Sequence, residues 1–179
     1  MAVLGGARRR NSSIIKNTPD SIEKALSSSH FYQGDKLDIE KVILDAGIKI
    51  QWDCLESEIS GKIERKHNDW TITVNKLHHP NRQRYTLAHE FAHYCLHRNL
   101  QNNFQDTTFF RKEGNMDNLE YEANRLAASI LMPEEKVRDT INKGEIKTLQ
   151  EIADAFGVSM IAMKYRLNNL GYKLIYDGE

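Results

Sequence analysis

The chain has 179 residues, 40% hydrophobic and 28% charged, which is enough for one good core and at most a small appended module. Lysine plus arginine and aspartate plus glutamate both number 25, so no excess of charge indicates nucleic acid, a membrane surface or an acidic protein as a partner. Two cysteines, Cys54 and Cys95, are too few to staple a secreted fold, and no apolar stretch has the length of a membrane span. We therefore expect a soluble cytoplasmic protein with reduced thiols and no membrane partner.

The first part of the chain is expected to contain a tail followed by two helices. Residues 1–17 include Gly5-Gly6 and a run of three arginines, and we expect a flexible N-terminal tail there. Thr18-Pro19 is typical of a helix start, and this helix is predicted to continue to about residue 28. A second helix is predicted over residues 38–46, with Asp38 as its N-cap and Gly47 as its stop.

Three short runs of alternating hydrophobic and polar residues come next, and they predict strands at 48–52, 59–64 and 70–74. The last two are separated by Lys66-His67-Asn68-Asp69, which is typical of a hairpin turn. The sequence therefore predicts a small antiparallel sheet containing one hairpin.

Most of the remaining chain is expected to be helical. Residues 83–98 are apolar nearly all round, which predicts a buried helix, and residues 117–132 regain helical periodicity up to Pro133. Further helices are predicted at 134–142, 148–156 and 160–169, with a strand at 172–176. We therefore expect the α+β fold class. Residues 18–133 should form a compact domain in which a small antiparallel sheet packs on helices. Residues 134–179 should form a C-terminal helical module with helix-turn-helix spacing.

The segment His89-Glu90-Phe91-Ala92-His93 matches the pattern H-E-x-x-H. Two imidazoles four residues apart lie on the same face of a helix and can bind one metal ion, and nitrogen ligands at this spacing suit zinc. Glu90 lies one position round the helix, where it can reach a metal-bound water as a general base. The alternative is a histidine pair on a solvated surface, but this helix is too apolar for that.

A catalytic zinc ion normally has three protein ligands, so a third donor is expected downstream. His97 lies a full turn beyond the other histidines, and we assign it to packing or to supporting a ligand. Glu120 is the better donor, because it lies on the next helix beside an apolar stripe. Asn124 is four residues further on the same face and could support a zinc-bound histidine. Glu122 is interpreted as a surface acid.

The sequence resembles the ImmA/IrrE metallopeptidases. The match is close at residues 82–97, 120–128 and 131–133, and looser at Ile59-Ser60-Gly61, 72–75 and 158–171. The resemblance covers about residues 36–173. It implies a gluzincin-like fold of the zincin type that binds one Zn2+, with the first acid of Glu-x-x-Ala-Asn, here Glu120, as the third ligand. Known members of the family cleave helix-turn-helix repressors and so switch on mobile elements or stress responses.

The expected reaction is therefore peptide hydrolysis, with Glu90 moving the proton and a further side chain stabilising the oxyanion. Tyr94, His97 and Arg84 are the candidates for the latter, although Tyr94 could simply pack and Arg84 could pair with an acid. By analogy with other zincins, the strand at 70–75 is expected to pair with an extended substrate. The polar segment 99–115 is long for a connector and could be a substrate loop.

A competing hypothesis is a DNA-binding regulator, because residues 149–159 and the helix after them have helix-turn-helix spacing. The nearby cations Lys164, Arg166 and Lys173 are offset by acids, so we do not expect direct DNA binding. A third hypothesis is a catalytically silent zincin fold that sequesters a repressor, and the presence of Glu90 speaks against it. The sequence does not indicate an oligomeric state.

Overall fold

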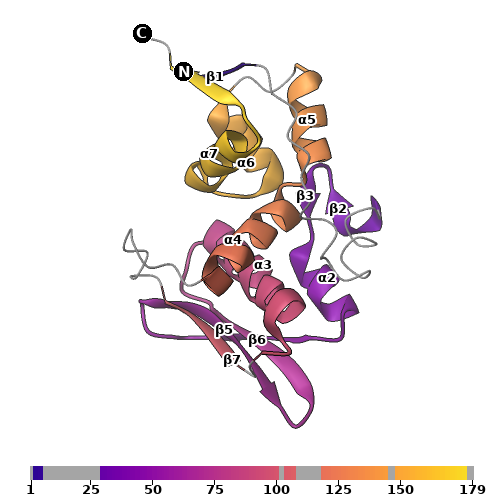
Figure 1. Cartoon of the computed structure of the whole chain (residues 1–179), viewed down its shortest axis with the longest axis vertical. Coiled ribbons are helices and arrows are strands. Elements are labelled where there is room, and N and C mark those ends of the chain that lie inside the picture. Colours follow the sequence, from indigo (N-terminus) through magenta and orange to yellow (C-terminus); the bar gives the residue numbers. More distant parts are fainter. Residues whose placement is uncertain (1, 6–28, 101–102, 108–117, 145–147, 177–179) are drawn as a thin grey trace.

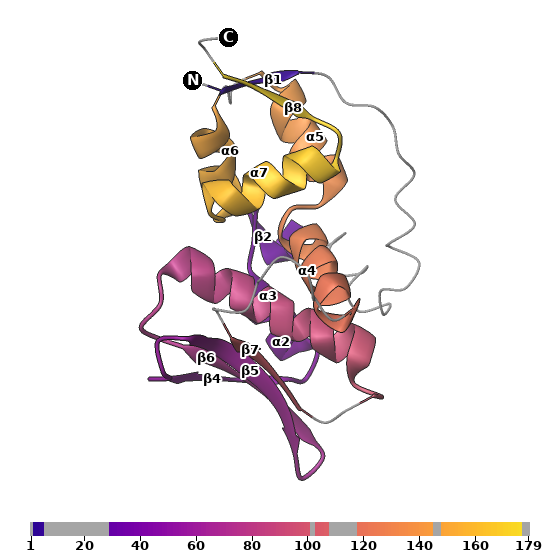
Figure 2. The ribbon, with the colours of Figure 1, turned by 60° about the vertical axis from the view of Figure 1, so that its left-hand side comes forward.

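The computed structural model of the chain describes residues 2–5, 29–100, 103–107, 118–144 and 148–176. A four-stranded sheet lies at one end, and helix α3 (Pro80–His97) crosses one face of it. Helix α4 (Asn118–Leu131) packs against α3, and helices α5 (Glu134–Asn142), α6 (Leu149–Phe156) and α7 (Met160–Asn169) lie at the other end (Figures 1 and 2). The predicted α+β class is thus observed in its coarse form.

The sheet has the strand order β4-β6-β5-β7, where β4 is Lys49–Asp53, β5 is Ile59–Lys66, β6 is Asp69–Asn75 and β7 is Asn103–Thr107. The predicted hairpin joins β5 to β6, and its central residues His67 and Asn68 have positive φ, as a tight two-residue turn requires. The prediction of a wholly antiparallel sheet is wrong at β4, which runs parallel to β6. The hairpin places β6, rather than β5, beside β4, and β6 points the same way as β4.

The position of β6 also corrects the expected site of substrate pairing. Residues 70–75 belong to β6, which pairs with β4 on one side and with β5 on the other. Both of its edges are therefore occupied, and an extended peptide cannot add there. The sheet instead ends at β4 and β7, and β7 lies within the polar segment for which no strand was predicted.

Helix α3 begins at Pro80, three residues earlier than predicted, because His79 caps it: the Asn81 amide donates to the ring Nδ1 of His79 at 3.2 Å. The helix approaches the sheet closely at Gly61 of β5. A Cβ atom at Gly61 would lie 2.5 Å from Cγ2 of Thr86 and 2.7 Å from the carbonyl oxygen of Thr73. The missing side chain at Gly61 therefore allows α3 to lie against the strands.

The segment before the sheet forms a short 3-10 turn (Ser29–Phe31), the strand pair β2 (Tyr32–Gln33) and β3 (Lys36–Leu37), and helix α2 (Ile39–Asp45). Asp38 caps α2 as predicted, since its carboxylate accepts from the Lys41 amide at 3.1 Å. The helix predicted over 18–28 lies outside the described residues. Strand β1 (Ala2–Gly5) pairs with β8 (Lys173–Tyr176), so the prediction of a flexible tail is wrong for residues 2–5, while 6–17 are outside the described residues.

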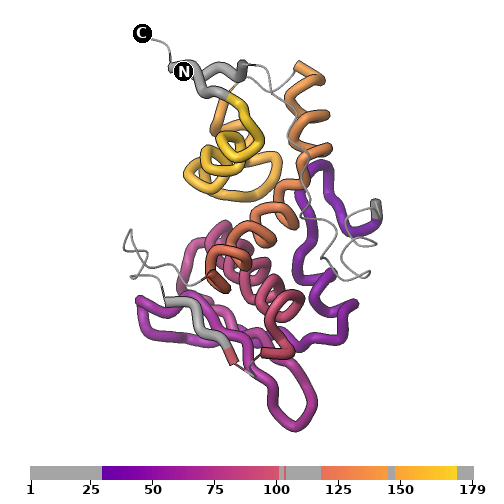
Figure 3. Tube along the Cα trace, viewed as in Figure 1, coloured from indigo at the N-terminus to yellow at the C-terminus, as the bar shows by residue number. Residues whose placement is uncertain are grey.

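The three C-terminal helices are found where they were predicted. A capping box formed by Thr148 and Glu151 starts α6, Gly157 ends it in the left-handed conformation, and Ser159 caps α7. In the Cα trace of Figure 3, α4 leads directly into α5, at the end of the molecule away from the sheet. One hydrophobic cluster extends from Phe31 to Tyr172 across the predicted boundary at residue 133. None of the described helices is both long and apolar enough to cross a membrane.

Candidate metal centre

Helix α3 carries four ring side chains at intervals of four residues: Tyr85, His89, His93 and His97. Since an α-helix has about 3.6 residues per turn, these rings lie on one face. The exposed fractions of His89, His93 and His97 are only 2%, 1% and 2%. Buried imidazoles need polar partners, and α4 supplies them because it packs against this face of α3.

Glu120, in the first turn of α4, lies against both predicted histidine ligands. Its Oε2 is 3.2 Å from Nε2 of His89, and its Oε1 is 3.2 Å from Nε2 of His93. The two Nε2 atoms are themselves 3.0 Å apart. The structure thus brings together the three side chains that the sequence predicted as ligands, with their ligand atoms all within 4.8 Å of one another.

The protonation of this group suits a cation. Hydrogen bonds from His89 and His93 hold the pKa of Glu120 well below its ordinary value, so the carboxylate is ionised. Burial lowers the pKa of His93, and this effect exceeds the opposing effect of Glu120. A carboxylate and neutral imidazoles are the states in which these side chains bind metals.

The donor set fits zinc. Two imidazole nitrogens and one carboxylate oxygen form a frequent set in catalytic zinc sites, with ligand bonds of about 2.0 to 2.2 Å. Tetrahedral ligands at such bond lengths lie about 3.3 to 3.5 Å apart, close to the 3.0 and 3.2 Å found between these atoms. Glu90, the predicted general base, lies next to His89 on α3 and is fully buried.

Asn124 lies one turn beyond Glu120 on α4, but it contacts a tyrosine rather than a histidine. The hydroxyl of Tyr85 donates to Oδ1 of Asn124 at 2.9 Å, and the Tyr85 ring stacks on His89 with a centroid distance of 6.5 Å. Among the described residues, Nδ1 of His89 is buried without a hydrogen-bond partner. Tyr85 was not among the site residues predicted from the sequence, although its position four residues before His89 is a signal that places it on the ligand face.

The other candidates lie in three different environments. Tyr94 packs edge-on against Trp70 of β6, with ring centroids 5.6 Å apart. Arg84 donates to the carbonyl oxygens of Leu37 at 2.8 Å and Gly157 at 3.1 Å, so it joins β3 and the end of α6 to α3 instead of pairing with an acid. His97 lies between His93 and α4.

The interpretation of Glu122 as an ordinary surface acid is incomplete. The carboxylate Oε2 of Glu122 lies 3.2 Å from Nε2 of His97, so Glu122 is not simply a surface acid. The other ring nitrogen of His97, Nδ1, lies 3.1 Å from Nδ1 of His93. His97 therefore lies between Glu122 and His93, one of the proposed metal ligands.

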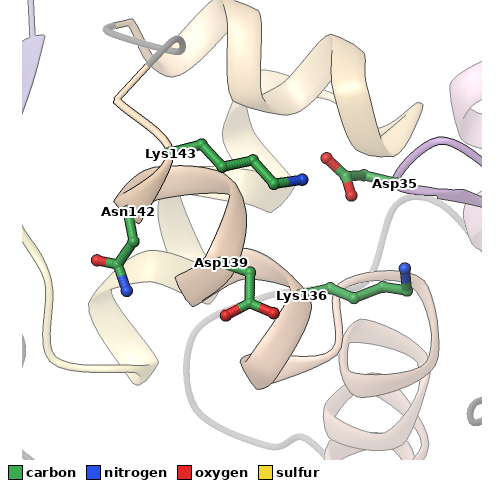
Figure 4. A pocket seen from close by; sticks show the side chains of 5 residues that line it. All are labelled: Asp35, Lys136, Asp139, Asn142 and Lys143. Carbon is green, nitrogen blue, oxygen red and sulfur yellow. The ribbon is translucent and has the colours of Figure 1, made fainter.

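A separate pocket of about 400 Å³ lies between α5 and the β2–β3 turn, away from the histidines (Figure 4). Charges of both signs line it, from Asp35, Lys136, Asp139 and Lys143. Asp35 also accepts a hydrogen bond from the hydroxyl of Thr140 at 2.8 Å. The balance of charge in this pocket does not favour a particular ligand.

Comparison with protein families gives a match that includes both parts of the metal group. The family model Peptidase_M78, described as the IrrE N-terminal-like domain, matches residues 29–168. A search of curated proteins gave no match. The matched residues are most of the chain and include α3, α4 and the helices up to α7, which confirms the ImmA/IrrE resemblance seen in the sequence. The chain belongs to the IrrE N-terminal-like peptidase family M78.

Proposed function

We propose that this protein is a zinc-dependent endopeptidase with a zincin-like fold of the gluzincin type, in which His89, His93 and Glu120 bind the metal and Glu90 is the general base. Family membership supports a metallopeptidase. The observation that carries the proposal is the convergence of two buried imidazoles from α3 with one carboxylate from α4. A catalytic zinc site uses three protein ligands and leaves one position for water or substrate.

The chemistry follows from these side chains. When bound, zinc acts as a Lewis acid that activates a water and polarises the scissile carbonyl. Glu90 accepts the proton that the attacking water loses as its oxygen bonds to the carbonyl carbon. As the C–N bond breaks, Glu90 donates a proton to the amine nitrogen of the leaving peptide. Burial of Glu90 supports this role, because a proton acceptor shielded from bulk water retains its proton until the leaving group needs it.

The substrate we propose is a helix-turn-helix transcriptional repressor, whose cleavage would derepress a mobile element or a stress response. This step rests on the family resemblance. We also propose that α6 and α7 form a helix-turn-helix-like module that contacts the repressor or packs on the catalytic unit. Two observations favour a protein over DNA as the partner of this module. Arg166 is only 9% exposed and its Nε donates to the Met132 carbonyl, so this cation is not available to DNA phosphates. Ile161 and Tyr165 of α7 are exposed, and such apolar side chains suit a protein surface.

An extended substrate would pair with a free edge of the sheet, and β7 is the suitable strand. Within the described part of the chain, β7 pairs with β5 alone, and it lies near α3, whereas the other edge strand, β4, packs with α2. Main-chain hydrogen bonds to an edge strand hold a peptide in an extended conformation independently of its sequence. We therefore propose β7 in place of the strand at 70–75.

The test combines metal analysis with a cleavage assay. The full chain would be purified, its zinc content measured, and a candidate helix-turn-helix repressor incubated with it. We expect zinc-dependent fragments from the wild type and none from Glu90→Gln, which retains the metal ligands. Glu135→Gln is the matched control, because Glu135 is exposed on α5. Zinc-bound protein that leaves the repressor intact but shifts a DNA fragment would instead support the regulator.

A further inference from the structure

A line of polar contacts runs from the surface of α4 to the metal group. Glu122 Oε2 lies 3.2 Å from His97 Nε2, and His97 Nδ1 lies 3.1 Å from His93 Nδ1. Nε2 of His93 then faces Glu120 at 3.2 Å and His89 at 3.0 Å. A carboxylate and two imidazoles are therefore connected in series, with the proposed zinc ligands at the inner end.

The direction of each hydrogen bond follows from how an imidazole binds a metal. A neutral imidazole carries one proton, and the other nitrogen has the lone pair that can bind a metal or accept a hydrogen bond. If Nε2 of His93 binds zinc, its proton is on Nδ1, which donates to Nδ1 of His97. His97 must then carry its own proton on Nε2, which donates to the carboxylate of Glu122. One arrangement of protons thus satisfies every contact.

We infer that Glu122 and His97 are positioning residues that hold His93 in the tautomer and ring orientation required for zinc binding. This inference rests on the proposed zinc function. Without a metal, a proton on Nε2 of His93 could be accepted by Glu120, so two tautomers of His93 compete. Glu122 favours the zinc-binding one, since a carboxylate only accepts and thereby fixes the proton of His97 on Nε2.

The two residues contribute unequally. His97 is 2% exposed, so its ring is held by its surroundings, and its hydrogen bonds form without competing water. The side chain of Glu122 is 57% exposed, so water competes with His97 for its carboxylate. We therefore expect removal of His97 to weaken zinc binding more than removal of Glu122. Because Glu120 and Glu122 share the first turns of α4, docking of this one helix brings both to the histidines.

The experiment measures zinc affinity of the full chain by competition with a chromophoric chelator. Loss of a group that supports a metal-bound histidine typically costs about 10- to 100-fold in affinity. We expect His97→Ala to fall within this range and Glu122→Ala to lose about 10-fold. Glu122→Gln should lose less affinity than Glu122→Ala, because its amide oxygen can still accept from Nε2 of His97, although its NH2 group can also donate. Glu135→Ala, an exposed acid on α5, is the control and keeps full affinity.

A double-mutant comparison separates positioning from general loss of structure. In His97→Asn the side-chain oxygen can still accept from Nδ1 of His93, but the link to Glu122 is broken. Adding Glu122→Ala to His97→Asn should then cost nothing further, whereas independent effects would add. Unchanged affinity in Glu122→Ala, or additive losses in the double variant, would overturn the inference alone. A wild-type chain that binds no zinc would overturn the proposed function as well.

Discussion

Among the proposed ligands, Glu120 has the most exposed side chain, at 39%, whereas His89 and His93 are buried within α3. Glu120 is also the ligand that comes from a different helix. The neighbouring histidines lower the pKa of its carboxyl group, which favours the ionised form. The two imidazoles therefore form a partial site, and Glu120 supplies its negative charge.

Glu120→Ala is expected to reduce zinc affinity by more than about 100-fold, since losing a ligand costs more than losing a group behind a ligand. Chelator competition measures this loss, with Glu135→Ala as the matched acid variant. Because the Glu120 side chain is 39% exposed, the metal-free fold should survive its removal. Zinc binding by Glu120→Ala at wild-type strength would show that a different donor completes the site.

The two thiols also differ at the residue scale. Burial raises the pKa of the Cys95 thiol to about 12, while Cys54 is exposed. Because the thiolate is the reactive form, and a raised pKa leaves less of it at any pH below that value, Cys95 should resist alkylation at about pH 8. Mass spectrometry of the native protein treated with iodoacetamide should find one label, on Cys54. Denaturant should expose Cys95, and equal labelling of both thiols in the native chain would contradict the burial of Cys95.

At the scale of elements, the contact between β5 and α3 sets the distance between the sheet and α3, the helix that carries His89 and His93. Gly61→Ala would place a Cβ atom against Thr86 and the Thr73 carbonyl oxygen. Overpacking of this kind costs about 1 to 3 kcal/mol, which chemical denaturation would measure. The variant should also bind zinc more weakly, because α3 must move and carries His89 and His93.

A second substitution tests that cause. Thr86→Ala removes the nearer of the two clashing atoms, so Gly61→Ala combined with Thr86→Ala should be more stable than the sum of the two single changes indicates. The Thr73 carbonyl belongs to the backbone and stays, so recovery should be partial. Strict additivity of the two changes would show that Gly61 does not limit the approach of α3.

Elements with their own local signals could be predicted from the sequence, while those that depend on pairing could not. Thr148, Gly157 and Ser159 mark the ends of α6 and α7, and the structure has these ends where they were expected. Strand β7 has no such signal, because its conformation comes from pairing with β5. The parallel partner of β4 is likewise decided by how the hairpin folds back.

The same distinction applies within the site. The four-residue spacing of His89 and His93 is a property of one helix, so it was visible in the sequence. Glu122 was interpreted as a surface acid because its contact with His97 arises only when α4 docks on α3. Asn124 lies on the expected face, but its partner is Tyr85, and this contact too arises only when α4 docks on α3.

At the scale of the whole molecule, polar contacts as well as the core join the C-terminal helices to the rest. Nδ2 of Asn81 donates to the Val158 carbonyl at 3.1 Å, and Arg84 donates to Gly157 at the end of α6. Arg166 of α7 donates to Met132 at 2.9 Å, and burial lowers its pKa to about 10. A buried guanidinium retains its charge most favourably when its donors are satisfied, so these contacts resist separation of the two parts.

This continuity predicts that zinc stabilises the whole described core and not only α3 and α4. At a free concentration about 100 times its Kd, zinc should add about 2.7 kcal/mol to the free energy of unfolding. For a chain of this size that corresponds to a rise in Tm of about 5 to 10 °C.

The two tryptophans, Trp52 and Trp70, lie in the sheet, so fluorescence follows the sheet while far-ultraviolet circular dichroism follows all helices. Because one hydrophobic cluster connects these regions, both signals should show a single transition that zinc shifts equally. A second circular-dichroism transition that zinc leaves in place would instead mean that α5, α6 and α7 unfold independently of the metal centre.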